Sequence, residues 1–311
     1  MKNEMAEIFD GAVDLHSHPA PAPFPREYDI VEAAKHYAEA GFFGAVAKSH
    51  HHPSTTDIDI VKKHGLIPHG FTLFGSLVLN ASVGGLNPWA VDVAVNQYGA
   101  KVVWLPTVSA RNHKAFVARG GRLGNVTYPG ATKKLMPDRV VEVVDERGVL
   151  LPEVDEIIGL VRDGGAILAT GHISPGEIMM VLERGRSLGL DRIVVTHPMD
   201  IVEATLDEAL RMVELGAYLE HMLGSFDPGS AVCYRSVKEL AEWIRAVGAD
   251  RTILVSDAGL RGLPWPVDAA RRVAQLLIDA GISAEELRTM WVVNPRALVG
   301  APVTEVSGAA R

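Results

Sequence analysis

The sequence has 311 residues, of which 48% are hydrophobic and 22% charged, so it can bury a large core. Its formal net charge of -8 argues against a nucleic-acid-binding surface, and no apolar run approaches the roughly 20 residues of a membrane-spanning helix. The N-terminal stretch MKNEMAEIFD lacks the apolar segment of a signal peptide, and a single cysteine, Cys233, excludes an internal disulfide. We therefore expect a cytoplasmic protein that binds neither nucleic acid nor membrane.

The first apolar strand leads into His16-Ser17-His18-Pro19. Alternate side chains of a strand share a face, so His16 and His18 are expected on the same side. Two neutral imidazoles placed in this way can bind one metal ion. Two core histidines satisfied by hydrogen bonds would give the same pattern, and the motif alone does not separate these interpretations.

Apolar strand-like runs then alternate with helical segments along most of the chain. The expected strands cover 42–47, 67–79, 101–105, 166–170, 192–196, 217–219 and 252–256, and the expected helices cover 30–40, 54–64, 88–98, 153–163, 175–188, 204–215, 235–247 and 266–280. From Arg111 to about Arg139 the periodicity is lost. Residues 140–151 are expected to form a short hairpin, and a last helix is expected from Ser283.

Apolar strands that alternate with helices are buried on both faces, which indicates an α/β protein with a parallel sheet. Eight strand–helix pairs are the number that closes a (β/α)8 TIM barrel, and we expect a single domain over residues 1–311. A doubly wound open sheet is the alternative. However, no glycine-rich phosphate loop follows the first strand, where such folds usually carry one.

Side chains that can bind a metal follow the C-terminal ends of several expected strands. A barrel gathers those ends around one mouth, where its active sites are built. Taken singly, each residue has an ordinary explanation, such as a helix cap or a loop histidine, but as a set they favour a metal site. They are His16 and His18, Lys48 and His50, His172, His197, Glu220 and His221, and Asp257.

These motifs resemble the amidohydrolase superfamily of metal-dependent hydrolases, from His16 to the C-terminal segment 294–300. The resemblance implies that His16, His18 and Asp257 hold one divalent metal, that His172 and His197 hold a second, and that Asp257 takes a proton from the attacking water. With only a short stretch before the first strand, the chain is most similar to the compact phosphotriesterase- and lactonase-like branch.

The strand at 101–105 departs from the family pattern, because it offers no Lys or Glu to bridge two metals. Lys48 could replace that residue as a carboxylated lysine, or it could be a cation that contacts substrate, and a one-metal site also stays open. The resemblance implies zinc first, with Mn, Fe or Ni as alternatives. Zinc lowers the pKa of bound water to about 7, and a carboxylate such as that of Asp257 can accept the proton.

The segment 111–139 carries seven Lys or Arg residues against one Asp. We expect an inserted basic loop at the mouth that attracts an anionic substrate; a solvated surface loop would have the same composition. The residues expected to contact substrate are His50, Arg111, His113, Tyr128, Glu220, His221, Arg261 and Trp265.

The sequence thus favours a metal-dependent hydrolase in which Asp257 and Lys48 are catalytic and the substrate is a small ester, lactone or amide, with an anionic group as an option. A single-metal non-oxidative decarboxylase of the same superfamily is the alternative, and a non-catalytic metal-binding protein is a third reading. The expected partners are a small-molecule substrate and further copies of the chain in a homo-oligomer.

Overall fold

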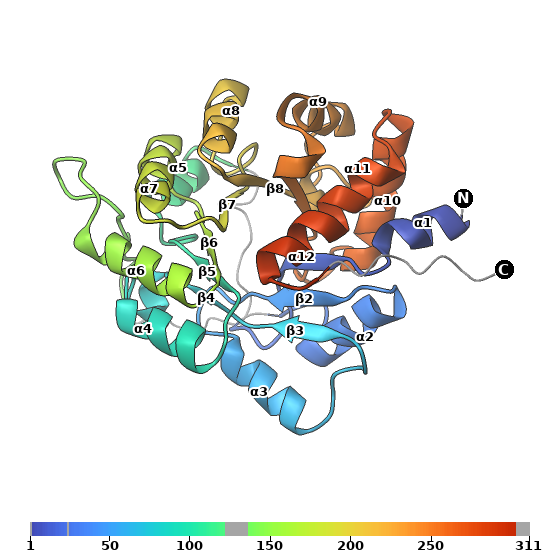
Figure 1. Cartoon of the computed structure of the whole chain (residues 1–311), viewed down its shortest axis with the longest axis horizontal. Helices are drawn as coiled ribbons and strands as arrows, with labels where there is room; N and C mark the ends of the chain where they lie inside the picture. Colours follow the sequence, from blue (N-terminus) through green and yellow to red (C-terminus); the bar gives the residue numbers. More distant parts are fainter. Residues whose placement is uncertain (1, 24, 122–135, 303–311) are drawn as a thin grey trace.

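The chain folds around parallel β-strands, which helices surround on the outside (Figure 1). The structure, a computed structural model, describes residues 2–23, 25–121 and 136–302. Each strand pairing within these residues is parallel, as predicted. The strands are β1 Val13–Ser17, β2 Gly44–Ala47, β3 Thr72–Phe74, β4 Ser76–Val78, β5 Val102–Trp104, β6 Ile167–Ala169, β7 Ile193–Thr196, β8 Tyr218–Met222 and β9 Thr252–Val255.

These strands form a (β/α)8 barrel. Hydrogen-bonded ladders run in the order β1-β2-β3 and in the order β4-β5-β6-β7-β8-β9, and β3 and β4 are successive parts of one barrel strand. The circle is completed beyond the end of β9. There the backbone N–H of Asp257 donates to the carbonyl of His16 (2.9 Å), and that of His18 donates to the carbonyl of Ala258 (2.7 Å). The barrel prediction is confirmed, and the doubly wound alternative is wrong.

The third barrel strand is shorter and more broken than predicted. Strand structure begins at Thr72 rather than at Ile67, and it is interrupted at Gly75 between β3 and β4. A Cβ atom at Gly75 would lie 2.6 Å from Cγ2 of Thr55, the first residue of helix α3. The helix therefore packs directly on the strand backbone at this point, which only glycine permits.

The predicted helices are present with small shifts at their ends, except that 88–98 is the α-helix α4 followed by a π-helical turn, Val93–Gln97. Capping boxes begin several of them, such as Ser174 with Glu177 before α7 and Ser283 with Glu286 before α11. The α-helices are α1 Lys2–Phe9, α2 Ile30–Glu39, α3 Thr55–Lys63, α4 Pro88–Asp92, α5 Arg111–Ala118, α6 Pro152–Asp163, α7 Pro175–Ser187, α8 Leu206–Glu214, α9 Val237–Val247, α10 Pro266–Asp279, α11 Ala284–Arg288 and α12 Asn294–Val299.

The strands divide the hydrophobic core into an inner and an outer part. Inside the barrel, apolar side chains from the strands pack together, among them Val46, Val194 and Ile253, and Leu298 of α12 joins them. Outside, a second set packs the strands against the surrounding helices. Toward the C-terminal ends of the strands the inner side chains become polar, which is where barrel enzymes build their sites.

The segment that was predicted to be irregular begins with a helix. Residues Arg111–Ala118 form α5. Only Phe116 of this helix is buried, so its sequence shows no repeating pattern of apolar residues. Residues 122–135 lie outside the described residues. The predicted hairpin at 140–151 is reduced to one antiparallel bridge, between Val144 and Leu150, around a turn in which Gly148 has a φ of 76°.

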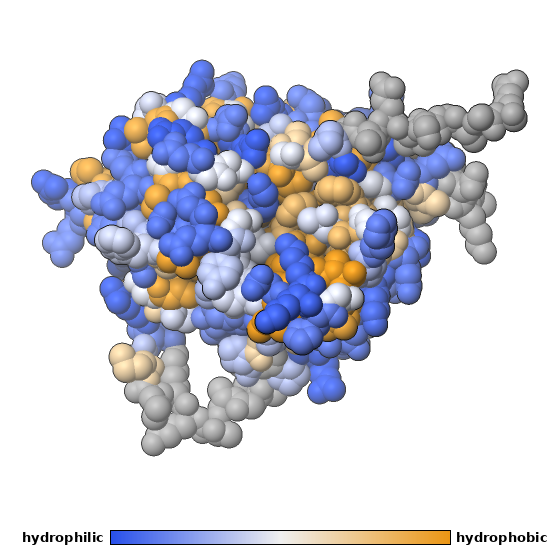
Figure 2. Space-filling view, turned by 60° about the horizontal axis from the view of Figure 1, so that its bottom comes forward, coloured by the Kyte–Doolittle hydropathy of each residue, from blue (hydrophilic) through white to orange (hydrophobic). Residues whose placement is uncertain are grey.

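The described surface is mixed in polarity. On the face shown in Figure 2, hydrophobic residues (orange) form separate patches between hydrophilic residues (blue). Among the helices of residues 2–23, 25–121 and 136–302, none combines the length and apolarity required to cross a membrane.

Candidate metal centre

A bulge in β1 brings two histidines into the barrel. From Asp14 to Ser17, β1 advances three residues while its partner β2 advances two. The extra residue re-aims the strand. Leu15 packs in the barrel interior and so does the next residue, His16, which strict alternation would place outside. His18 then follows on the inside, so the prediction that the two histidines share a face holds.

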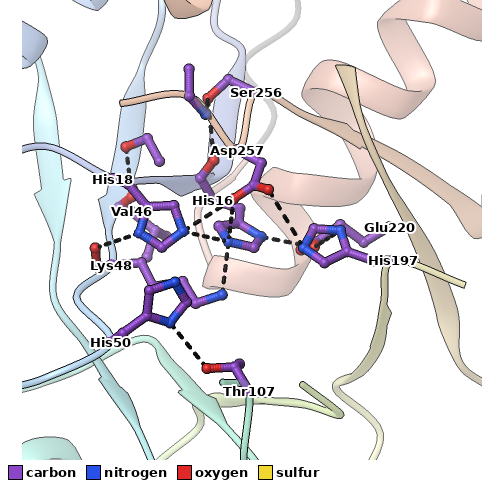
Figure 3. Close-up of polar contacts among 12 residues, drawn as sticks. His16, His18, Val46, Lys48, His50, Thr107, His197, Glu220, Ser256 and Asp257 are labelled. Carbon is purple, nitrogen blue, oxygen red and sulfur yellow. Dashed lines mark hydrogen bonds and ion pairs between the residues drawn. The ribbon is translucent and has the colours of Figure 1, made fainter. Parts of the chain in front are cut away.

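His16, His18 and Asp257 form a tight triangle at the mouth of the barrel (Figure 3). His16 Nε2 lies 3.2 Å from His18 Nε2. Asp257 Oδ1 lies 2.9 Å from the first of these nitrogens and 3.1 Å from the second. Both rings are buried, whereas the Asp257 side chain is 19% exposed. The carboxylate is therefore the member of the triangle that can meet a molecule entering the mouth.

The other ring nitrogen of each histidine has its own acceptor. His16 Nδ1 lies 2.9 Å from Glu220 Oε1, and His18 Nδ1 lies 3.1 Å from the backbone oxygen of Lys48. A backbone carbonyl only accepts, so Nδ1 of His18 carries the proton, and the Glu220 carboxylate favours the same tautomer of His16. The Nε2 lone pairs then point toward each other and toward Asp257.

This set of donors fits a divalent cation. Two Nε2 lone pairs at 3.2 Å, next to a carboxylate oxygen, repel one another unless positive charge lies beside them, from a bound cation or from the Lys48 amine 2.8 Å from His16 Nε2. Neutral imidazoles with a carboxylate are also the ligands that zinc and similar ions prefer. His197 joins the set, because ligand atoms of His16, His197 and Asp257 all lie within 4.8 Å of one another.

The pKa of each group reflects the charges around it. Burial and Lys48 act to lower the pKa of His16, but Asp257 and Glu220 outweigh them and raise it. The carboxylates thus favour positive charge at this ring. Burial lowers the pKa of His18 to about 3, which keeps it neutral. Burial acts to raise the pKa of Asp257, yet the three histidines around it hold it well below its usual value.

The backbone is strained at two residues of the centre. His197 and Asp257 adopt φ values of 51° and 47°, in the left-handed region that non-glycine residues seldom enter. Such a conformation costs on the order of 1–3 kcal/mol and is found mainly at functional sites. His197 directly follows β7, Asp257 lies two residues after the end of β9, and His197 Nε2 is brought to 3.7 Å from Asp257 Oδ2.

Lys48 is a buried amine beside the histidines. Its Nζ lies 2.8 Å from His16 Nε2 and 4.6 Å from the centre of the ring of Trp104, which is the inner residue at the end of β5. Burial lowers the pKa of Lys48 to about 8, although Asp257 and Glu220 act in the opposite direction. A larger fraction of this amine is therefore neutral at pH 7 than in an ordinary lysine.

The opposite side of the mouth holds histidines without a carboxylate. His172 follows β6, and its Nδ1 lies 2.8 Å from His113 Nδ1 of α5. The ring of His172 is 5.4 Å from that of His197, and its Nε2 is buried with no hydrogen-bond partner among the described residues. Gly171 permits this approach, because at its φ of 63° a Cβ atom would lie 2.3 Å from the carbonyl oxygen of Leu105.

His50 lies beside the triangle, as predicted. Its ring is 4.7 Å from that of His18, and its Nδ1 lies 3.0 Å from Thr107 Oγ1. Burial holds the pKa of His50 well below its ordinary value. Farther along the same tract, His52 Nε2 bonds to Asp57 Oδ2 (2.9 Å), so this histidine is already engaged outside the centre.

Glu220 and His221 are neighbours on β8 and face opposite ways. Glu220 points into the barrel, whereas the ring of His221 packs on the outside against Trp243 of α9, with ring centres 5.9 Å apart. The prediction that both contact substrate is therefore wrong for His221. Successive residues of a regular strand cannot share a face.

Other predicted contacts lie away from the triangle. Trp265 packs against α2 on the outside of the barrel, with its ring 4.8 Å from that of His36. Arg111 has a side chain that is 72% exposed, and Arg261 lies in an exposed turn after β9. Tyr128 falls outside the described residues.

Two residues near the centre were not predicted. Arg26, from the proline-rich loop after β1, places Nη2 3.5 Å from His18 Nδ1, and its backbone bridges to Leu260 beyond β9. It is the basic residue of that loop, and this feature of the sequence could have indicated a contact at the site. Trp104 packs on His16 with ring centres 5.3 Å apart, and its inward position follows from the alternation of β5.

The comparisons with known proteins agree with the barrel. A family of unknown function, DUF6282, matches residues 11–220, and among curated proteins none matches the chain. The chain is similar to an amidohydrolase from Pseudomonas aeruginosa (12% identity, TM-score 0.56, covering 96% of this chain and 97% of that chain). It is also similar to a phosphotriesterase homology protein from Escherichia coli complexed with phosphate in its active site (14%, 0.53, 94% and 99%).

A third similar structure is 2,6-dihydroxybenzoate decarboxylase from Rhizobium (13% identity, TM-score 0.51, covering 94% of this chain and 99% of that chain). These structural neighbours are members of the amidohydrolase superfamily, so the resemblance noted in the sequence is confirmed for the fold. Identities this low transfer the fold and not the reaction.

Proposed function

The chain belongs to the DUF6282 family, whose function is unknown, and we propose that it is a metal-dependent enzyme whose ion is held by His16, His18, His197 and Asp257. The observation that carries the proposal is the convergence of His16 Nε2, His18 Nε2 and Asp257 Oδ1 within 3.2 Å of one another. The convergence occurs at the C-terminal mouth of a barrel, which is the usual place of an active site in this fold.

The residues of the centre support catalysis of hydrolysis. A bound divalent ion supplies Lewis-acid polarisation of substrate and eases the ionisation of water. In the proposed reaction Asp257 accepts a proton from the attacking water and passes it to the leaving group, a role supported by its partial exposure and by a pKa held well below its usual value. Lys48 is proposed to hold an oxygen of the substrate, because its Nζ lies 2.8 Å from His16 Nε2 at the centre.

We take the substrate to be a small ester, lactone or amide, with a negatively charged group favoured by two cations, one beside His16 and one beside His18. Lys48 is one of them, and the guanidinium of Arg26 is the other. His50 and His113 remain proposed contacts. The test is a panel of lactones, esters and amides, each with and without a carboxylate. Zinc-loaded protein should turn over one member, and a chelator should abolish that activity.

A single-metal decarboxylase is the second candidate. Within the described residues, the potential ligand atoms of His16, His18, His197 and Asp257 gather around one point, which favours one ion over two. One structural neighbour is named as a decarboxylase. Release of CO2 from aromatic carboxylates, without hydrolysis of any ester or lactone, would support this candidate over the first.

A second ion would need His172 and a bridging ligand, and Lys48 is the candidate bridge. A neutral amine can react with CO2 to give a carbamate, and the lowered pKa of Lys48, about 8, increases the neutral fraction relative to an ordinary lysine. The competing role is an ammonium that orients an anionic substrate. Electron density beyond Nζ of Lys48 in a crystal of metal-loaded protein would distinguish the two roles.

Zinc is the first candidate for the ion, because histidine-rich ligand sets suit it, with Mn, Fe and Ni next. A cytoplasmic location and a homo-oligomeric state stay predictions from the sequence. Metal analysis of purified protein, gel filtration with light scattering and cell fractionation would test these three points.

A further inference from the structure

Glu220 is a buried carboxylate that lies on the Nδ1 side of two of the proposed ligands, His16 and His197. Its side chain is 1% exposed, and its Oε1 lies 2.9 Å from His16 Nδ1 and 3.8 Å from His197 Nδ1 (Figure 3). It comes from β8, which lies in the sheet between β7 and β9. The same oxygen therefore lies within hydrogen-bond distance of one histidine ring and near the ring of a second, and the two histidines belong to different strands.

The position of Glu220 does not suit contact with substrate. The carboxylate lies on the Nδ1 side of His16, whereas Asp257 lies on the Nε2 side, where the ligand atoms converge. Within the described residues, the ion pairs of Glu220 are to His16 and His197 and to no Lys or Arg. An ordinary surface salt bridge or a substrate-binding group would not have this pattern.

His197 needs a hydrogen-bond acceptor that the Glu220 carboxylate can provide. Its Nδ1 is buried and has no hydrogen-bond partner within the described residues, and Glu220 Oε1 is 3.8 Å away. A histidine that binds metal through Nε2 normally donates Nδ1–H to a carboxylate or a carbonyl, which fixes the tautomer and raises the basicity of the ligating nitrogen. Glu220 is positioned to supply this acceptor to both rings.

We propose that Glu220 is a positioning residue that keeps the proton on Nδ1 of His16 and of His197, so that both rings present Nε2 to one cation, and that it thereby sets the affinity for that cation. This inference rests on the metal centre proposed above. It assigns to Glu220 a role in metal affinity instead of the substrate contact expected from its place after a strand.

The test compares zinc affinities by competition with a chromogenic chelator at constant pH. Glu220→Ala removes the acceptor, and it should weaken binding by about 10- to 100-fold, the usual effect of losing such a partner. Glu220→Gln keeps an acceptor oxygen of the same shape, so most of the affinity should return. Cobalt loading provides a second readout, because the visible absorption of bound Co²⁺ reports the ligand set.

Asp227→Asn is the matched control. Asp227 is also a buried carboxylate in the segment after β8, but it pairs with Arg272 of α10 (2.7 Å) and accepts from the backbone N–H of Gly229. This variant should lose stability and keep the zinc affinity of the wild type. If both variants weaken zinc binding to the same extent, the effect is general loosening of the fold and the inference is wrong.

The outcomes separate the inference from the proposal on which it rests. Failure of the wild type to bind zinc stoichiometrically would overturn the metal centre itself. Zinc affinity of Glu220→Ala within about 3-fold of the wild type would overturn the role of Glu220 and leave the centre intact. If Glu220→Ala does not fold, the test is made on the zinc-loaded wild type, where long-range ¹H–¹⁵N spectra locate the proton on each histidine ring. A proton on Nδ1 of His16 and His197 supports the inference, and coordination through Nδ1 contradicts it.

Discussion

Buried histidines lie on both faces of the barrel wall, and only those on the inner face form a candidate site. His18 inside and His221 outside both have a pKa lowered to about 3, in each case mainly by burial. Their surroundings differ. His18 Nε2 meets His16 and Asp257, whereas both ring nitrogens of His221 are buried with no hydrogen-bond partner in the described part of the chain. Burial and a shifted pKa therefore do not identify a site, and the convergence of ligand atoms does.

Among variants of the inner face, Asp257→Asn should cause the largest loss of activity. The amide keeps an oxygen near His16 and His18 but cannot accept the proton that the proposed reaction releases. We expect the variant to retain much of its metal and to lose activity by about 100-fold or more, the usual scale for general acid–base groups. Metal content by mass spectrometry and kcat on the same preparation check this, and undiminished activity would remove Asp257 from the chemistry.

Lys48→Ala should have the next largest effect, and its form depends on the role of the amine. If Lys48 forms a bridging carbamate, the variant should lose at least one metal ion per chain, and short carboxylic acids should restore part of the activity. If the ammonium orients an anionic substrate, the metal content should stay constant and KM should rise. Metal analysis with and without added acetate distinguishes the two outcomes.

Arg26→Gln should have a smaller effect that depends on the charge of the substrate. A charge-assisted hydrogen bond contributes roughly 1.5–3 kcal/mol, so losing it should reduce kcat/KM about tenfold or more for a carboxylated substrate. The neutral methyl ester of the same substrate should be affected much less. An equal loss for both substrates would show that Arg26 supports the loop after β1 instead of binding the anion.

Much of the inner face could be predicted, because it follows from strong local patterns. Apolar runs with a polar residue at the C-terminal end placed His16, Lys48, His197 and Asp257 at one mouth. The bulge of β1 could not be predicted, since it depends on pairing with β2 and breaks the periodicity on which a prediction relies. The position of Arg26 could not be predicted either, because a proline-rich loop carries no periodic pattern.

The wrong expectation that His221 contacts substrate could have been avoided from the sequence. Glu220 and His221 are consecutive in β8, so alternation allows only one of them to point into the barrel. The inner face of this strand is identified by Met222, which packs in the barrel interior and lies two residues from Glu220. The same rule predicts that His221 faces the helices. The helix α5 was missed for another reason, because its packing depends mainly on one apolar residue, Phe116.

His221→Phe should have the smallest effect on activity and a specific effect on stability. Phenylalanine preserves a ring against Trp243, so activity and zinc affinity should stay within about twofold of the wild type. The pKa of His221 is about 3 in the folded protein and near 6.5 when unfolded. Below pH 6.5 the unfolded chain binds a proton that the folded one does not. The stability linked to this group is therefore complete above pH 6.5 and is lost as the pH falls toward 3.

The size of this loss follows from the two pKa values. Between pH 7 and pH 4.5 the wild type should lose roughly 2–3 kcal/mol through His221 alone, and the Phe variant should not lose this part. Urea unfolding of chelator-treated protein at the two pH values measures the difference, with the other buried histidines unchanged in both proteins. An equal pH dependence in the variant would mean that His221 titrates normally in the folded state, and that it is not enclosed in the apolar shell outside β8. A large loss of activity would instead mean that His221 faces the barrel interior, and that the two sides of the barrel wall do not differ in function.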